Sequence, residues 1–501
     1  MSYEGQLHHP HDRGYPPSPQ LLLNSQSTIP PNFTLLQAHW FVRHGERAPV
    51  RQRMVGLGEI PAVFELCSVA RNFTSVVTTL APLPSSSSSS LQPAPPSPNP
   101  FISSTRHTTL HSSSSSTTTH KPHFPVSPTT RQMPVQRFTE DLPDSTSSKP
   151  TKGGPTSCYW GELTDLGRQS TLRFGSILRS LYVDSPQKNT PFLPSSLDPS
   201  TVQFRSTNMP RTIESLHQVI EGLYPGVEQG VEFRVRNWMD ENLYPNTACK
   251  RLRALDAVSI QNAAKTHNPS LATLDEVLRP VLRGIMKSEG GLRIDSSPRA
   301  NGVLDTLMVC RAHGIKVPKV FERRDVLEVL ERGVVHEWFD GYLSPEFRRL
   351  AMGRLFSDIH SHLSSKIDNP STDPLKLLVN SCHDTSLGGI LNTLDAFDGR
   401  WPPFTSNIGI ELYKQDSSSP TSSSSSSISS KLSSILPSST NKSKHFVRVL
   451  YNGRELELPA CQKEGNHLEG SEGRICTFEA FEGVLKKWGM SQGEWEKECG
   501  E

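Results

Sequence analysis

A histidine between two arginines is the feature of this 501-residue chain best suited to chemistry. Residues 43–49 have the sequence R-H-G-E-R-A-P, so His44 follows Arg43 directly and lies three positions before Arg47. Guanidinium groups bind the oxygens of phosphate or carboxylate, and a neutral imidazole nitrogen is a nucleophile. Gly45 lets the backbone of this segment approach a neighbour closely. The spacing therefore indicates an anion-binding loop that carries a nucleophile.

Two further polar segments could complete such a site. Arg205 begins the segment R-S-T-N-M-P-R-T at residues 205–212, and His383 and Asp384 are adjacent late in the chain. A His-Asp dipeptide alone is weak, because about one is expected by chance in a chain of this length. Its structural alternative is a helix-capping aspartate beside a packed histidine. Its position after a short apolar run favours the functional interpretation.

Each of the three polar segments follows an apolar run of strand length. These runs are Leu35–Val42, Thr201–Phe204 and Leu375–Val379. Helical spacing of apolar residues follows the second and third polar segments. In open α/β sheets, ligands bind beyond the carboxyl ends of the strands, so loops distant in sequence can meet there. The sequence predicts an α/β fold with a Rossmann-like mixed sheet flanked by helices, and one pocket shared by three loops.

The same segments resemble the signatures of the histidine acid phosphatases, a branch of the histidine phosphatase superfamily. Residues 43–49 match R-H-G-x-R-x-P at every fixed position, and residues 205–212 are similar to R-S-T-x-x-x-R-T. Residues 161–167 resemble G-x-L-T-x-x-G, in which Thr164 is expected to cap a helix, and residues 383–384 resemble the late H-D pair. The resemblance extends over most of the chain outside its Ser-rich segments, and the lysophosphatidic acid phosphatase type is the branch it resembles most.

The resemblance implies a role for each site residue. His44 is expected to form a phosphohistidine, with its second nitrogen held by a backbone carbonyl near Gly45. Asp384 is expected to protonate the leaving oxygen and then to activate water. Arg211 is expected to be a surface or packing residue. No metal or other cofactor is expected, because cationic side chains neutralise the phosphate. The residues expected to bind the phosphate are Arg43, Arg47, Arg205 and a protonated His383.

The expected substrate is a small phosphate monoester, and a lysophospholipid such as lysophosphatidate is a candidate. The alternatives are a phytase-like inositol phosphate phosphatase, a mutase-like phosphotransferase and an inactive protein that binds phosphorylated ligands. The mutase-like branch normally lacks the pair found at residues 383–384, and an inactive protein would be marked by a lost motif residue, whereas none is lost. The charge balance, 52 Lys and Arg against 50 Asp and Glu, does not indicate a nucleic acid partner. The oligomeric state is not predicted.

Composition divides the chain into ordered and low-complexity parts. Residues 1–30 are expected to be a disordered tail, and residues 31–501 a discontinuous histidine acid phosphatase domain. Two Ser-rich segments, 76–155 and 415–444, are expected to be long disordered insertions. Residues 250–368 show helical periodicity and are expected to form a helical cap subdomain over the sheet. The expected parts of the α/β core are 31–75, 156–249 and 369–501.

The expected location follows from the start of the chain and from the cysteines. Residues 1–25 lack the apolar centre of a signal peptide, and no apolar stretch of about 18 residues predicts a transmembrane segment. The chain is therefore expected to be intracellular, in the cytoplasm, with the mitochondrion as an alternative. The eight cysteines form no C-x-x-C pair, which argues against structural zinc. Cys461 and Cys476 could pair in an exported protein, but the expected location predicts free thiols.

Overall fold

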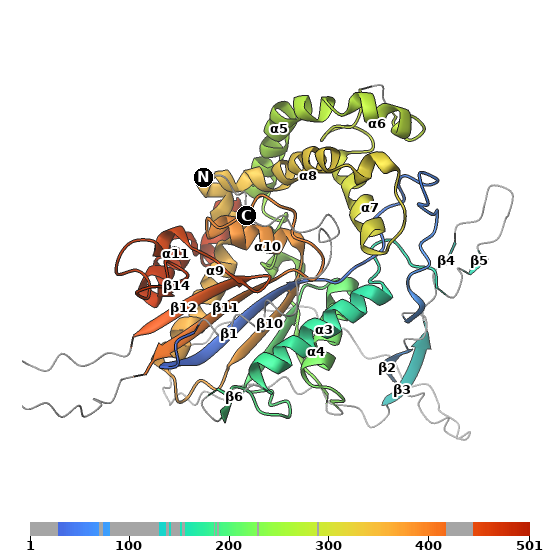
Figure 1. Ribbon diagram of the computed structural model, residues 1–501. Helices are drawn as coiled ribbons and strands as arrows, with labels where there is room; N and C mark the ends of the chain where they lie inside the picture. The colour runs from blue at the N-terminus through green and yellow to red at the C-terminus, as the bar shows by residue number, and fades with distance from the viewer. Residues whose placement is uncertain are drawn as a thin grey trace, which may run out of the picture. The chain divides into compact units, whose positions relative to one another are not determined.

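The structure is a computed structural model, shown as a ribbon in Figure 1. It describes residues 29–69, 74–80, 130–136, 140–141, 151–152, 156–184, 186–187, 190–227, 230–287, 290–416 and 444–500. The expected tail at residues 1–30 therefore lies almost entirely outside the described residues. The helices and strands below take the labels of Figure 1.

A mixed eight-stranded sheet forms the centre of the fold, as predicted. Its order is β13-β12-β11-β1-β10-β8-β9, with β14 paired to β12. Strand β1 pairs in parallel with β10, β10 with β8 and β8 with β9, whereas β11 and β12 are antiparallel to their neighbours. The strands are β1 (Phe33–Arg43), β8 (Val202–Ser206), β9 (Phe233–Arg234), β10 (Leu377–Cys382), β11 (Asn407–Gln415), β12 (His445–Tyr451), β13 (Arg454–Glu455) and β14 (Ile475–Thr477).

Helices cover both faces of this sheet because its central strands are apolar on both sides. Along β1, Trp40 and Val42 pack with helices α3 and α4, whereas Phe41 packs with the helices of the opposite face. Figure 1 shows α3 and α4 side by side along the sheet. The flanking helices are α3 (Asp165–Tyr182), α4 (Pro210–Leu223), α9 (Pro345–Asp368), α10 (Asp384–Thr393), α11 (Phe478–Trp488) and α12 (Gln492–Cys499).

Helices are the only regular elements in the described part of residues 250–368, and most of them share a second hydrophobic core. Leu304, Leu330 and Phe321 are fully buried in that core, and Ala48 and Phe404 join it from the site side. The last helix of this range, α9, packs on the sheet instead, where Phe356 and Ile359 share a core with Phe41. The other helices of the range are α5 (Lys250–Ala272), α6 (Asp275–Leu282), α7 (Ala300–Ala312), α8 (Arg324–Phe339), and the 3-10 turns η4 (Lys319–Glu322) and η5 (Asp340–Leu343).

Local sequence explains where several elements begin and end. The Thr164 hydroxyl accepts a hydrogen bond from the Gly167 amide at 3.3 Å, so Thr164 caps α3 as expected. Pro210 occupies the first turn of α4, where no amide hydrogen is needed. Asn452 and Gly453 both have positive φ, at 51° and 81°, which suits the tight turn between β12 and β13. The remaining 3-10 turns are η3 (Trp238–Asp240) and η6 (Pro459–Cys461).

The two Ser-rich segments fall largely outside the described residues. The described residues of the range 71–138 are β2 (Thr74–Leu80) and β3 (Thr130–Gln136), which make an antiparallel pair and belong to a separate unit. Short antiparallel pairs also join β4 (Glu140–Asp141) to β5 (Thr151–Lys152) and β6 (Pro186–Gln187) to β7 (Thr190–Pro191). Strand β11 includes Gln415, the first residue of the second segment. The division into domains stays a prediction.

Three disulfides correct the expectation of free thiols. Cys461 bonds to Cys476, and the other pairs are Cys67–Cys158 and Cys249–Cys499. Cys310 and Cys382 are the free cysteines, and both are buried. The prediction failed because it inferred the redox state from the start of the chain rather than from which cysteines the fold brings together.

Candidate active site

Three carboxyl ends of parallel strands bring the predicted segments together. The register pairs Arg43 at the end of β1 with Cys382 at the end of β10. His44 and His383, the next residue on each strand, therefore lie side by side, with ring centroids 5.8 Å apart. The His44 amide donates a hydrogen bond to the Cys382 carbonyl at 3.0 Å, which fixes this register beyond the strands.

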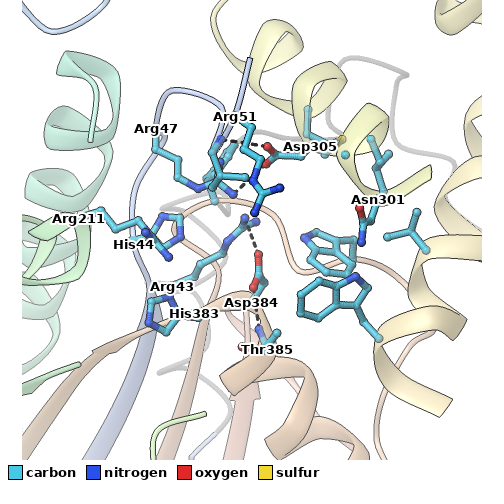
Figure 2. Close-up of a pocket in the computed structure, with 18 of the residues that line it drawn as sticks. Arg43, His44, Arg47, Arg51, Arg211, Asn301, Asp305, His383, Asp384 and Thr385 are labelled. Atoms are coloured by element: carbon cyan, nitrogen blue, oxygen red, sulfur yellow. Dashed lines mark hydrogen bonds and ion pairs between the residues drawn. The ribbon is translucent and has the colours of Figure 1, made fainter. Parts of the chain in front are cut away.

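A cavity of about 480 Å³ opens above these strand ends, toward helices α7 and α8. Figure 2 shows its polar side, where the labelled arginines and histidines are gathered opposite Asn301. Two aromatic rings, Phe404 and Trp401, enter from the loop between α10 and β11. The residues central to its chemistry are Arg43, His44, Arg47, Arg211, His383 and Asp384.

His44 is held in one tautomer. Its Nδ1 atom lies 2.8 Å from the Gly45 carbonyl oxygen, and because a carbonyl can only accept, Nδ1 carries the proton. The lone pair is therefore on Nε2, and the expected backbone partner near Gly45 is present. Burial, followed by the positive charges of Arg211 and Arg43, lowers the pKa of His44 well below its ordinary value. The imidazole thus stays neutral in acidic solution and keeps its lone pair.

The loop that carries His44 rests directly on the first turn of α3. A Cβ atom on Gly45 would lie 2.3 Å from the Gly167 carbonyl oxygen, so only glycine fits this approach. The Gly45 amide donates to the Ser215 hydroxyl of α4 at 3.1 Å. Glycine at position 45 therefore serves backbone packing, which orients the carbonyl that holds His44.

Arg43 is fixed at both ends of its guanidinium group. One nitrogen lies 2.7 Å from an Asp384 carboxylate oxygen, and the other donates to the Pro402 carbonyl at 2.5 Å. The guanidinium carbon stands 4.2 Å from the centre of the Phe404 ring, a cation–π contact. These contacts hold the group flat against the cavity before any ligand arrives.

Arg47 is held by a carboxylate of helix α7. It lies 2.9 Å from Asp305 on α7, and Figure 2 shows this ion pair at the upper edge of the cavity. The Nε atoms of Arg43, Arg47 and Arg211 are buried and have no hydrogen-bond partner among the described residues. Because these three arginines line the same cavity, an oxyanion bound there would meet three guanidinium groups.

Asp384 is the first residue of α10 and faces the arginines. Burial acts to raise its pKa, but the nearby charges of Arg43 and Arg47 outweigh this and hold the pKa below its ordinary value. The carboxylate is therefore ionised in the empty site. A phosphate dianion bound to the same arginines would offset their charge and shift this pKa upward.

His383 caps α10 and lies under the cavity floor. Its Nε2 atom is 2.9 Å from the Thr207 hydroxyl, and its amide donates to the Ser386 hydroxyl at 3.1 Å. Burial and the charge of Arg211 lower its pKa to about 3. The expectation of a protonated His383 is thus wrong for the empty site, because the surrounding arginines already supply the positive charge.

Comparison with known proteins decides the family. Residues 34–452 match the family model described as histidine phosphatase superfamily (branch 2). The chain belongs to this family. A probable acid phosphatase of Schizosaccharomyces pombe is 29% identical over 472 residues, covering 89% of each chain. Human lysophosphatidic acid phosphatase type 6 is 25% identical over 359 residues, covering 70% of each chain.

Solved structures agree with this histidine phosphatase fold. The multiple inositol polyphosphate phosphatase of Bifidobacterium longum, in its complex with inositol hexasulfate, aligns with a TM-score of 0.54. The alignment covers 96% of this chain and 98% of that one at 11% identity. At this identity the likeness concerns the fold alone.

One predicted site residue of this histidine phosphatase lies elsewhere. Arg205 is on β8, and because strand residues alternate between faces it points away from the side on which Phe204 packs. Its guanidinium group binds Glu241 at 2.6 Å and Asn242 at 2.8 Å. It lines a different cavity, together with Asp358. The assignment of Arg205 to the phosphate pocket is therefore corrected.

Arg211 occupies the place that was expected for Arg205. It lies in the first turn of α4, lines the cavity beside His44, and is labelled there in Figure 2. Burial and the charge of Arg47 lower its pKa to about 10, so it remains charged. The expectation of a surface or packing residue is wrong. The available signal was Pro210, since it starts a helix whose first turn follows a strand end.

The two arginines are expected to respond differently to substitution. Arg211→Gln should raise the inhibition constant for inorganic phosphate by at least about tenfold, because a charged hydrogen bond to the anion is lost. Arg205→Gln should leave that constant within about threefold but lower the free energy of unfolding by about 3–5 kcal/mol, since Glu241 loses a buried partner. Phosphate inhibition and thermal unfolding of both variants check this. A larger inhibition change in Arg205→Gln would contradict the placement.

Proposed function

We propose that this histidine phosphatase hydrolyses phosphate monoesters through a phosphohistidine on His44. The observation that carries the proposal is that His44, with its lone pair on Nε2, lines one cavity together with the guanidinium groups of Arg43, Arg47 and Arg211. Cationic side chains supply the charge that a phosphate dianion needs, and a fixed lone pair supplies the nucleophile.

The proposed first step transfers the phosphoryl group to the protein. Arg43, Arg47 and Arg211 bind the non-bridging oxygens, and the lone pair of His44 Nε2 attacks phosphorus in line with the leaving oxygen. The bond from phosphorus to that oxygen breaks, and a protonated Asp384 gives the leaving oxygen its proton. The phosphohistidine keeps its Nδ1 proton, and Nδ1 continues to donate a hydrogen bond to the Gly45 carbonyl.

The second step returns the free protein. Water attacks the phosphohistidine while the Asp384 carboxylate accepts a proton from that water. The bond from phosphorus to nitrogen breaks, and its electron pair returns to Nε2 of His44. The products are an alcohol and inorganic phosphate, which takes the proton from Asp384 as it leaves, and no metal ion is required because the arginines carry the positive charge.

The charges of the site predict activity in acidic solution. Asp384 is ionised in the empty site, since Arg43 and Arg47 hold its pKa below the ordinary value, so its proton must come with the substrate. The second ionisation of a phosphate monoester lies near pH 6, and the monoanion that carries this proton predominates below that value. The low pKa of His44 keeps the nucleophile neutral in the same range. The value of kcat/KM is therefore expected to fall above about pH 6.

Turnover of p-nitrophenyl phosphate in the presence of a chelator tests the proposed activity. We expect the rate at pH 5 to be the same with and without EDTA, and to decrease toward pH 8. Loss of the rate in EDTA, with recovery on adding a divalent ion, would contradict the proposal.

The wall of the cavity away from the arginines is apolar and supports a lysophosphatidate-like substrate. Trp338, Trp401, Val334, Leu304 and Met308 contribute to it. Trp338 retains 42% of its surface exposed, so its indole ring is accessible to a ligand in the cavity. A cavity of about 480 Å³ exceeds what a phosphate group fills, so space remains for an apolar leaving group.

A second candidate is the phytase-like activity, which the cavity charges favour. Six arginines line the cavity against two carboxylates, Asp305 and Asp384. A single phosphate dianion does not neutralise this surplus, whereas a polyphosphorylated inositol would. The values of kcat/KM for lysophosphatidate and for phytate, measured at the same ionic strength, separate the two candidates. We expect lysophosphatidate to have the higher value, and a higher value for phytate would favour the alternative.

The compartment also remains a proposal. No helix in the described residues has the length and apolarity to cross a bilayer. Disulfides persist mainly in oxidising compartments, and the structure has three. We therefore place the protein in an oxidising environment rather than in the cytoplasm that the start of the chain indicated.

A further inference from the structure

Two polar side chains lie among the apolar residues of the leaving-group wall. Arg299 precedes α7 and Asn301 lies in its first turn, and both line the cavity. Figure 2 shows Asn301 on the opposite side of the cavity from His44 and Arg211. Trp338 and Trp401 meet edge to face, with ring centroids 5.8 Å apart, in the same wall. This side therefore offers hydrogen-bond donors next to two indole rings.

A buried carboxylate on α8 holds both polar groups. Glu337 Oε1 accepts hydrogen bonds from Arg299 at 2.6 Å and from Asn301 at 2.8 Å. The Glu337 side chain is only 2% exposed, and its second oxygen has no hydrogen-bond partner among the described residues. A buried carboxyl group with one oxygen left without a hydrogen-bond partner is costly to keep.

The held groups keep donors for a ligand. Arg299 also donates from Nε to the Ile294 carbonyl at 2.7 Å, which leaves Nη1 without a partner among the described residues. The Arg299 side chain is 43% exposed, so these donors are accessible. The Asn301 amide uses one hydrogen for Glu337 and retains its other polar atoms. Both side chains are therefore held in place by Glu337 and still have hydrogen-bonding groups that a ligand could use.

We propose that Glu337 is a positioning residue that directs Arg299 and Asn301 toward a hydrogen-bond acceptor in the leaving group. The indole rings of Trp338 and Trp401 bind the apolar part of the same group. The substrate class is a phosphate monoester in which a carbonyl lies between the phosphate and an apolar chain, as in an acyl glycerol phosphate. This inference rests on the proposed function and names the part of the substrate that the arginines around His44 do not bind.

A pair of substrates that differ only in the carbonyl tests this inference. 1-Acyl and 1-alkyl glycerol 3-phosphates of equal chain length carry the same phosphate and the same apolar chain. Both are assayed below the concentration at which they form micelles. We expect kcat/KM to favour the acyl compound by at least about tenfold, because the alkyl compound leaves the charged donor of Arg299 and the amide of Asn301 without the carbonyl acceptor.

Substitutions at Arg299 and Glu337 should remove this preference. Arg299→Gln and Glu337→Gln are expected to reduce the acyl-to-alkyl ratio of kcat/KM to below about threefold, mainly through KM. Asn301→Ala, which leaves the ion pair between Arg299 and Glu337 intact, should reduce it partly. Arg251→Gln is the matched control, because Arg251 forms an exposed two-bond ion pair with Glu346 and does not line the cavity. It should retain the preference of the unsubstituted protein.

Several other results for these substrates and variants would contradict the inference. Equal kcat/KM values for the two substrates in the unsubstituted protein would show that the carbonyl is not bound. A variant that loses both substrates in parallel, with a lower melting temperature, would mean that Glu337 only joins α7 to α8. If Glu337→Gln does not fold, Arg299→Gln and Asn301→Ala decide the question. Failure with both lipids but turnover of p-nitrophenyl phosphate would refute this substrate class alone, whereas failure with all three would refute the proposed function.

Discussion

Replacing His44 with alanine is expected to reduce the turnover of any phosphate monoester by at least about a thousandfold, because the substitution removes the nucleophile itself. The arginines that bind phosphate would remain, so inorganic phosphate should still bind. The measurement is steady-state turnover of p-nitrophenyl phosphate together with phosphate binding by calorimetry.

His383→Ala is the comparison for this variant. Both histidines are buried and their rings are neighbours, yet only His44 has a lone pair fixed by a backbone carbonyl. We expect His383→Ala to retain a measurable rate and His44→Ala to retain none above background. A residual rate in His44→Ala equal to that of His383→Ala would show that the nucleophile is another group.

Replacing Asp384 with asparagine should separate substrates by the basicity of their leaving groups. An alkyl phosphate expels a strongly basic alkoxide, so loss of the acid should reduce its turnover by about a hundredfold or more. A p-nitrophenolate leaves without a proton, so the phosphohistidine should still form. Its hydrolysis then becomes slow, because the same carboxylate activates water.

The expected observation for Asp384→Asn is a burst of p-nitrophenol close to one equivalent, followed by slow turnover. Asparagine also removes the ion pair with Arg43, which lies 2.7 Å away, so phosphate binding must be measured on the same sample. Equal losses for alkyl and aryl substrates without a burst would mean that Asp384 only positions Arg43 and that the acid lies elsewhere.

The centre of the site could be predicted from the sequence because its residues are local to strand ends. His44 follows β1 directly, and His383 and Asp384 follow β10, so a short apolar run before a polar motif was sufficient to place them. The backbone carbonyl that holds His44 is that of Gly45, in the region that the family resemblance implied. The mixed sheet and its flanking helices were confirmed.

Arg205 and Arg211 show where this reasoning fails. Both lie in one motif, and the sequence does not show which one points to the pocket unless strand alternation and helix phase are known together. The disulfides were missed because Cys249 and Cys499 are 250 residues apart and meet only in the folded chain.

The contribution of helices α7 and α8 to the site could not be predicted from the sequence. Asp305 meets Arg47 from α7, and Glu337 holds Arg299 and Asn301 from α8, without a motif that marks any of them. Helical periodicity predicts that such segments exist, but not which polar side chain faces the sheet. The packing of these helices over the strand ends determines which polar side chains face the sheet.

The position of the phosphoryl group during turnover tests the central claim most directly. The protein is mixed at pH 5 with a substrate whose phosphoryl group carries an isotopic label, and the reaction is quenched in base within milliseconds. The protein is then digested and its peptides are examined by mass spectrometry. We expect a base-stable, acid-labile phosphoryl group on the peptide that contains His44. This phosphoryl group should appear and decay at rates consistent with turnover. Labelling of a different residue, or continuing hydrolysis with no phosphoryl group on His44 at any time, would contradict the central claim.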